Sequence, residues 1–351
     1  MKTDEKIETG RKKISATRKI LTVLLLIFLA LALLSIRKTP ERVEYGVSFS
    51  LFHSNELGLD WQKVYDAILD DLGVRRFRLS AHWQLTEPKD DEYDWYPLDY
   101  QIKRAGEMDA KVIFAVGRRL PGWPECHEPS WAKDLSDDKK QAEVLEYMTT
   151  VVNRYKGSPA ISYWQIENEP FLTFFAREHC QDFLDKEFLK KEIDLVRSLD
   201  PDRTILVTDS GELGLWYKAY QLGDSFGTSL YLYVWNHTLG PVRYPVPPAF
   251  FKIKRNIVEM LFNNSPTADR ASETLLIELS AEPWLLESTN PTPLEVVLGR
   301  MDIEKFNKVL EFAQNAGFEK QYLWGAEWWY YMMKEKKHPE FWERAKEINW
   351  Q

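Results

Sequence analysis

The sequence predicts an α/β fold, a (β/α)8 barrel preceded by a single N-terminal transmembrane helix. Three observations indicate it: an apolar run near the N-terminus, eight short apolar segments after that run, and amphipathic helical segments between them. Alternation of strands with helices is typical of parallel strands joined by crossover helices. Eight such units in roughly 305 residues match a barrel of this class, which typically has about 250 residues.

A doubly wound open sheet is the alternative for the same alternation. That fold usually has a glycine-rich phosphate loop after its first strand. The first expected strand here continues into residues 49–54, Phe-Ser-Leu-Phe-His-Ser, which contain no glycine. The barrel is therefore the favoured fold class.

The apolar run covers residues 20–36 and contains no charged side chain. At about 1.5 Å per residue it would extend over roughly 25 Å, the short end of a membrane span. Seven Lys or Arg residues precede the run and three follow it. The positive-inside rule then predicts a cytoplasmic basic tail at 1–19, a signal-anchor at 20–36 and the remainder outside the cell. The alternative is a signal peptide cleaved near residues 30–32, Ala-Leu-Ala, which would leave the domain secreted.

Residues 37–44 are expected to form a linker, and residues 45–351 the barrel domain. The expected strands are 45–51, 74–80, 111–117, 160–166, 203–208, 226–234, 274–279 and 320–325, and the expected helices include 60–72, 136–156, 184–199, 249–263 and 302–316.

Composition excludes several functional classes. The 46 Lys and Arg residues against 54 Asp and Glu give a net charge of −8, which argues against a general nucleic-acid binder. Two cysteines exclude a disulfide-dense scaffold and a four-cysteine zinc site. The 14 Trp, 16 Tyr and 18 Phe residues exceed the needs of a core, and such an excess often serves flat ligands such as sugar rings.

Two carboxylates lie at strand ends, where the active site of such a barrel belongs. The fourth expected strand ends in Asn168-Glu169-Pro170, and the seventh contains Glu278 between apolar residues. Taken alone, Glu169 would be a surface carboxylate and Glu278 part of a core ion pair. Together they predict a pair facing each other across the barrel mouth. Cleavage of a glycosidic bond needs such a pair, because one carboxyl protonates the leaving oxygen and the other attacks the anomeric carbon or activates water.

On these motifs, the sequence resembles the glycoside hydrolases of the (β/α)8 superfamily called clan A, over roughly residues 43–335. The resemblance implies that Glu169 is the acid/base and Glu278 the nucleophile of a retaining reaction on β-linked oligosaccharides or polysaccharides. It does not select one family, since the strand-2 region is similar to β-galactosidase-like members and the strand-4 motif to cellulase- and xylanase-like members. Glu282 is the alternative nucleophile, but it lies four residues further on, in the loop before Pro283.

The resemblance also implies substrate-binding residues. Arg78 matches a clan arginine whose charge would keep the nucleophile ionised. Asn168 matches the asparagine that contacts the sugar 2-hydroxyl. Tyr231 is expected to donate to the nucleophile, with Tyr233 as the alternative. Trp328 is expected to form the floor of the subsite for the cleaved sugar, with Trp324 as the alternative.

Further substrate contacts are expected from His82 and Trp83 after strand 2 and from Trp123 after strand 3. For each single aromatic residue, core packing would explain its presence equally well. The histidines show no metal-binding spacing, so we expect neither a catalytic metal nor a cofactor.

Cys126 and Cys180 follow strands 3 and 4, whose loops are neighbours in a barrel. Because an exported domain meets an oxidising environment, a disulfide between them is expected, and two free thiols are the alternative. Two other functions stay open: a membrane-tethered carbohydrate-binding protein without catalysis, and a transglycosylase that uses the same covalent intermediate.

Overall fold

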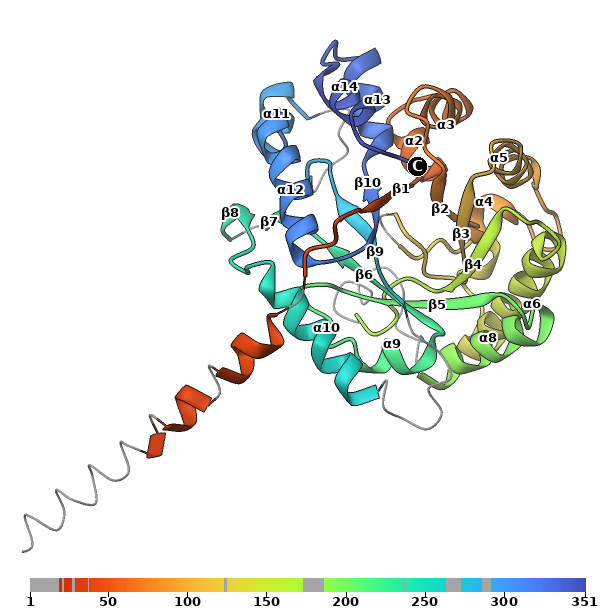
Figure 1. Ribbon diagram of the computed structural model, residues 1–351. Coiled ribbons are helices and arrows are strands. Elements are labelled where there is room, and N and C mark those ends of the chain that lie inside the picture. Colours follow the sequence, from red (N-terminus) through yellow and green to blue (C-terminus); the bar gives the residue numbers. More distant parts are fainter. Residues whose placement is uncertain are drawn as a thin grey trace, which may run out of the picture.

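The computed structural model describes residues 19–20, 22–26, 29–36, 38–122, 125–172, 186–236, 238–262, 273–285 and 292–351. Eight parallel strands close into a barrel (Figure 1), which confirms the expected alternation. In order around the barrel these are β1 (Glu44–Ser48), β10 (Lys320–Trp324), β9 (Thr274–Ser280), β6 (Ser225–Leu230), β5 (Thr204–Asp209), β4 (Ile161–Ile166), β3 (Lys111–Val116) and β2 (Arg76–Ser80).

Helices surround the barrel and connect its strands. They are α2 (Leu51–Glu56), α3 (Trp61–Asp70), α4 (Trp83–Thr86), α5 (Tyr96–Glu107), α6 (Asp137–Tyr155), α8 (Lys186–Leu199), α9 (Tyr217–Leu222), α10 (Ala249–Phe262), α11 (Leu294–Arg300), α12 (Ile303–Ala316), α13 (Ala326–Lys334) and α14 (Glu340–Lys346), with a short 3-10 turn at Ser130–Ala132.

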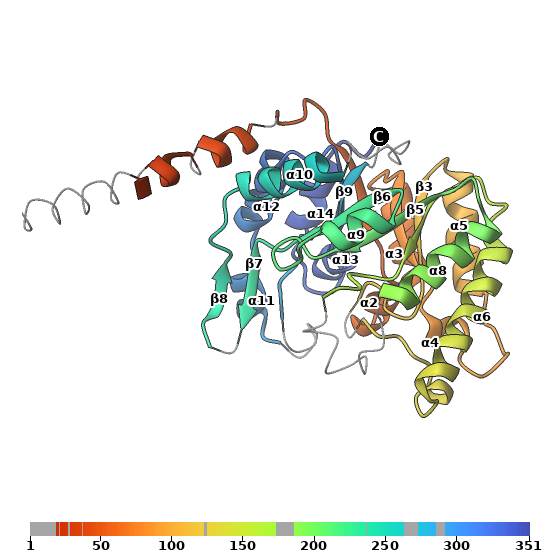
Figure 2. The same cartoon turned by 90° about the horizontal axis from the view of Figure 1, so that it is seen from below.

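Two expected strands end earlier than the apolar pattern indicates. The first ends at Ser48, because the Ser50 side chain accepts a hydrogen bond from the His53 N–H and so caps α2. The sixth ends at Leu230, and the chain then forms an antiparallel hairpin of β7 (Tyr233–Asn236) and β8 (Gly240–Arg243). The side view in Figure 2 shows this hairpin next to α11.

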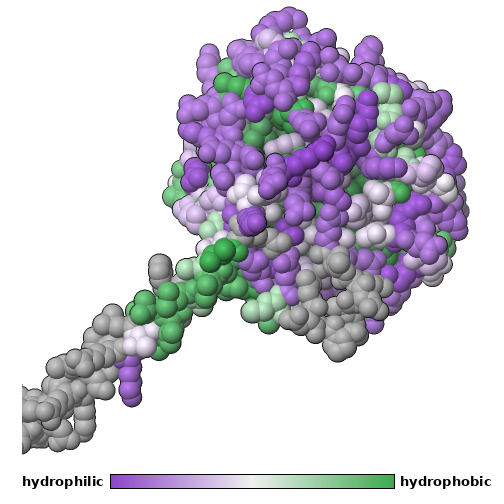
Figure 3. All heavy atoms as spheres, viewed as in Figure 1, coloured by the Kyte–Doolittle hydropathy of each residue, from purple (hydrophilic) through white to green (hydrophobic). Residues whose placement is uncertain are grey.

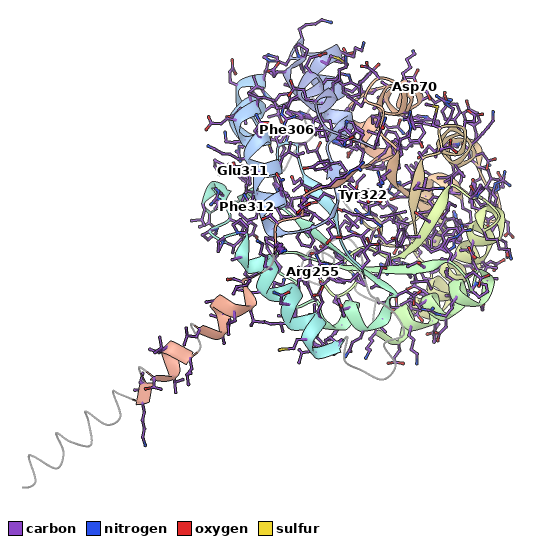
Figure 4. The ribbon with its side chains drawn as sticks, viewed as in Figure 1. Asp70, Arg255, Phe306, Glu311, Phe312 and Tyr322 are labelled. Carbon is purple, nitrogen blue, oxygen red and sulfur yellow. The ribbon has the colours of Figure 1, made fainter. Side chains whose placement is uncertain are left out.

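The core has two apolar clusters. The larger cluster lies between strands and helices, and there Phe306 of α12 packs edge-on against Trp329 of α13, with ring centroids 5.4 Å apart. The smaller cluster consists of Ile113, Leu206, Leu275, Ile277 and Tyr322. Figure 4 shows Phe306 on α12 and Tyr322 near the middle of the barrel. A Cβ atom at Gly46 would lie 2.7 Å from the Tyr322 ring, so glycine at that position makes room for the tyrosine.

The N-terminal apolar segment requires a correction. Its described helical residues are 19–20, 22–26 and 29–34, and Figure 3 shows them as a hydrophobic segment projecting from the barrel. A transmembrane helix needs about 20 consecutive apolar residues. Within the described part of the chain, no helix has the length and apolar character needed to cross a bilayer, so the prediction of a transmembrane helix at 20–36 is wrong. Most of the expected basic tail, residues 1–18, lies outside the described residues.

Candidate active site

Arg78, near the end of β2, connects three strands at the barrel mouth. It is 1% exposed. Its Nε donates to Gln165 Oε1 at 2.8 Å, its Nη1 to Glu278 Oε2 at 2.6 Å and its Nη2 to Asn168 Oδ1 at 2.7 Å. Because the guanidinium is a rigid planar fork, it fixes the relative positions of these three side chains.

Glu278, on β9, is 7% exposed and accepts from two donors. One oxygen pairs with Arg78, and the other accepts a hydrogen bond from the Tyr231 hydroxyl. Tyr231 directly follows β6, and its ring packs edge-on against Trp284 at a centroid distance of 4.9 Å. Burial, and then the negative charge of Glu278, raise the pKa of Tyr231 well above its ordinary value, so the hydroxyl keeps its proton and remains a donor.

The chain after β4 turns sharply to present Glu169. Glu167 has φ +57° and Glu169 has φ +44°. Residues other than glycine rarely adopt such backbone angles, which cost about 1–3 kcal/mol each. The Glu167 carboxylate accepts hydrogen bonds from the backbone N–H groups of Arg118 at 2.7 Å and Arg119 at 2.5 Å. The Glu169 N–H donates to Thr208 Oγ1 at 2.9 Å. These bonds from the β3 and β5 ends hold the strained turn in place.

The environment of Glu169 favours its protonated form. The residue is 6% exposed. Burial raises the pKa of its carboxyl well above the ordinary value, and the negative charges of Glu125 and Glu278 raise it further. These influences favour a Glu169 carboxyl that keeps a proton to donate, whereas the Glu278 carboxylate faces the Arg78 cation.

Arg119 joins the loop after β3 to the turn that carries Glu169. Its Nε and Nη2 bind Glu125 Oε2 at 2.7 and 2.6 Å. Its Nη1 donates to the backbone oxygens of Glu169 at 3.0 Å and Leu172 at 2.8 Å. Glu125 is thus a third carboxylate close to the pair, held by the same arginine that positions the Glu169 backbone.

His82 supports the same loop and does not carry a charge. Its Nε2 lies 2.9 Å from the Pro121 oxygen, and its ring centroid lies 4.1 Å from that of His127. Burial lowers the pKa of His82 to about 4 and that of His127 well below its ordinary value. Both imidazoles are therefore neutral and hold the loop through its carbonyl groups.

Two predicted substrate contacts are wrong because the side chains are completely buried. Trp83 is 0% exposed, and its indole donates to Glu87 and stacks on Tyr147. Trp328 is also 0% exposed and packs against Phe341 of α14 at 4.5 Å. Both indoles belong to the core beneath the helices.

Trp324, the alternative, ends β10 and lies at the barrel mouth. Its Nε1 donates to Glu282 Oε1 at 2.5 Å, and its ring stacks on His53 with centroids 6.0 Å apart. The other oxygen of Glu282 lies 2.9 Å from His53 Nε2. Glu282 therefore binds a tryptophan and a histidine, whereas Glu278 receives the arginine and the tyrosine.

Some predicted residues are only partly described. Cys126 is disulfide-bonded, and Cys180 lies outside the described residues. Trp123 also lies outside them. Sequence reasoning gave no site role to Arg119 or His53. Arg119 lies three residues after β3 and His53 five residues after β1, and this closeness to strand ends is the signal that could have found them, because strand ends carry the chemistry of this fold.

Comparison with known proteins finds relatives among glycosidases, although no family model matches the chain. A probable mannan endo-1,4-β-mannosidase A of Aspergillus niger is 26% identical over 121 residues, which are 32% of this chain and 30% of that protein. Mannan endo-1,4-β-mannosidase A of Podospora anserina is 27% identical over 173 residues, 44% of this chain and 43% of that protein. The chain thus spans less than half the length of these curated relatives.

A solved structure shows the same fold. GH5_18 from Bifidobacterium longum subsp. longum superposes with a TM-score of 0.56 at 14% identity, covering 81% of this chain and 70% of that chain. Another structure of GH5_18 from this organism, in complex with Manβ1-4GlcNAc, has a TM-score of 0.56 at 13% identity and covers 81% and 68%. The chain resembles the (β/α)8 glycosidases of clan A. This clan resemblance agrees with the closed parallel barrel.

Proposed function

We propose that the protein is a retaining β-glycosidase that hydrolyses β-linked glycans containing mannose. One observation carries the proposal: Glu278, bound by Arg78 and Tyr231 near the end of β9, lies close to the Glu169 carboxyl that follows β4, whose pKa is raised by burial and by the charges of Glu125 and Glu278. A proton donor and an anionic nucleophile are the two groups that the retaining reaction needs.

In the first step, Glu278 Oε attacks the anomeric carbon while the bond from that carbon to the leaving oxygen breaks. Glu169 gives its proton to the leaving oxygen, which departs as an alcohol. The sugar is then held as an ester of Glu278. Ester formation removes the negative charge on Glu278, one of the charges that raise the pKa of Glu169. The pKa of Glu169 therefore falls, which prepares it to act as a base.

In the second step, water attacks the anomeric carbon, the ester bond to Glu278 breaks, and the Glu169 carboxylate takes the proton from the water. Both residues return to their starting protonation states. Two inversions at the anomeric carbon give net retention of configuration.

The proposed substrate class is supported by the relatives, by Trp324 and by Asn168. Both mannan endo-1,4-β-mannosidases and the complex of GH5_18 with Manβ1-4GlcNAc concern β-linked mannose. Trp324 is a partly exposed indole at the mouth, and a sugar ring can stack on such a face. Arg78 fixes the orientation of Asn168, and we expect Asn168 to bind the 2-hydroxyl, the position at which mannose differs from glucose.

The test is turnover of 4-nitrophenyl β-glycosides and β-mannan by the wild type, Glu278→Ala and Glu169→Ala. We expect Glu278→Ala to be inactive and to be rescued by azide as the inverted azide adduct. We expect Glu169→Ala to retain turnover of activated aryl glycosides, because their leaving groups need no proton, with azide products of retained configuration. Glu92→Gln, an exposed carboxylate paired with Lys89, is the matched control.

A mechanism-based fluorosugar followed by peptide mass spectrometry identifies the nucleophile. We expect the label on Glu278. A label on Glu282 would overturn the assignment, an inverted product would overturn the retaining mechanism, and binding of glycans without any turnover would overturn the enzymatic proposal.

A further inference from the structure

Three segments far apart in the sequence meet at the ends of β9 and β10. Glu282 follows β9, His53 lies on α2, Trp324 ends β10 and Gly325 precedes α13. Gly325 has φ +117°, and a Cβ atom there would lie 2.7 Å from the Glu282 Cβ. Glycine is thus needed at this position for Glu282 to reach the tryptophan and the histidine. The backbone as well as the side chains therefore accommodates this arrangement.

His53 uses both ring nitrogens within the protein. Nε2 faces Glu282 at 2.9 Å, and Nδ1 faces Glu56 at 3.3 Å. Burial opposes its charge, but the negative charge of Glu282 and the hydrogen bonds to both carboxylates prevail and raise the pKa of His53 well above its ordinary value. His53 is therefore a cation without a free N–H, and it balances the charge of Glu282.

Glu282 keeps acceptor capacity for a ligand. An ionised carboxylate offers about four acceptor positions. Its two oxygens take one hydrogen bond from the Trp324 indole and one from His53. The side chain is 14% exposed, so its remaining acceptor positions are reachable from the mouth of the barrel.

We propose that Glu282 is a specificity-determining residue that accepts a hydrogen bond from one hydroxyl of the sugar stacked on Trp324. The inference rests on the proposed glycosidase function and assigns a new role within it. His53 covers one face of the indole, so the sugar stacks on the opposite face. Glu282 binds the indole edge through Nε1, which places the acceptor at the rim of the stacked sugar ring.

The hydroxyl is one at C3, C4 or C6. The anomeric carbon must face Glu278, and Asn168 on the β4 side is placed for the 2-hydroxyl. Glu282 lies on the other side, between β9 and α2. Because His53 neutralises Glu282, the site suits an uncharged hydroxyl donor and offers no net negative charge for an ammonium group.

The experiment compares kcat/KM for the 4-nitrophenyl β-glycoside that the wild type cleaves fastest with its 2-, 3-, 4- and 6-monodeoxy forms. In the wild type, removal of the recognised hydroxyl at C3, C4 or C6 is expected to lower kcat/KM by about 10- to 100-fold, the range for a hydrogen bond to a charged group. In Glu282→Gln this one penalty shrinks about tenfold, whereas the 2-deoxy penalty is unchanged. This cycle isolates the pairing of one side chain with one hydroxyl.

Two further variants distinguish recognition of a sugar hydroxyl by Glu282 from mere support of the Trp324 side chain. Trp324→Phe removes the Nε1 donor but keeps a ring, and it should lower kcat/KM for all five substrates, because each of them stacks on this side chain. Glu56→Gln changes only the outer partner of His53 and should leave every deoxy penalty as in the wild type. If Glu282→Gln also lowers all five substrates uniformly, Glu282 only braces Trp324 and the inference is overturned. Absence of wild-type turnover on any glycoside would instead refute the proposed function.

Discussion

Replacing Arg78 by lysine keeps the positive charge but removes the fork that joins β2, β4 and β9. A lysine ammonium can still pair with Glu278, but it cannot reproduce the bonds at 2.8 Å to Gln165 and 2.7 Å to Asn168. Those two acceptors belong to side chains that are 0% and 1% exposed. Buried acceptors left without a donor cost about 1–3 kcal/mol each. We therefore expect the free energy of unfolding to fall by about 2–4 kcal/mol.

The same change should lower activity. Without its bond to Arg78, Asn168 loses its fixed orientation, and the Glu278 carboxylate opposite Glu169 is held by a flexible ammonium in place of a planar guanidinium. Misplacement of a catalytic group by about 1 Å can cost roughly 100-fold in rate. We expect a fall in kcat/KM of that size for Arg78→Lys with an aryl β-glycoside, together with a lower midpoint in urea unfolding.

Arg76→Lys is the matched control on the same strand. Arg76 pairs with Glu44 at 3.0 Å, and both side chains are partly exposed, at 24% and 38%. Its replacement should change the free energy of unfolding by less than about 1 kcal/mol and leave kcat/KM unaltered. If Arg78→Lys unfolds at the wild-type urea concentration, the bonds to Gln165 and Asn168 contribute nothing. If Arg78→Lys is destabilised yet fully active, Arg78 does not position Asn168 and Glu278 for catalysis.

Three further predictions follow from the site. Glu125→Gln removes a negative charge that raises the pKa of Glu169, so the alkaline limb of the kcat/KM profile should move to lower pH; an unmoved limb would count against this coupling. The pKa of His82 is lowered from 6.5 to about 4, so between these values the unfolded chain binds a proton that the folded protein does not. This group should therefore lower the free energy of unfolding by about 3 kcal/mol as the pH drops through that window. Urea unfolding at pH 7 and at pH 4.5 measures the decline, and the difference between the two pH values should be smaller in His82→Gln than in the wild type. Gly325→Ala places a Cβ atom 2.7 Å from Glu282 at φ +117° and should cost roughly 2–4 kcal/mol in the same assay; wild-type stability would contradict the close approach.

Sequence reasoning located the strand-end residues better than the aromatic ones. Arg78, Glu169 and Glu278 lie at the mouth because each is within three residues of the carboxyl end of a strand, and strand ends converge in a closed barrel. Trp83 and Trp328, two of the three tryptophans assigned to the substrate, are buried for one reason. Trp83 begins α4 and Trp328 lies in α13, and a helix turns its apolar face to the core.

The sequence by itself determined the alternation of strands and helices, the closed barrel that follows from it, and the positions of Glu169 just after the fourth strand and of Glu278 near the end of the seventh. These depend on patterns within a few residues, which local propensity and periodicity set. Tertiary structure decided that the charges of Glu125 and Glu278 act on Glu169, and that His53 meets Glu282 across 229 positions of the chain. It also decided that Trp324, and not Trp328, stands at the mouth. Those outcomes required the barrel to close, because burial and the distances between loops exist only once strands remote in sequence lie side by side.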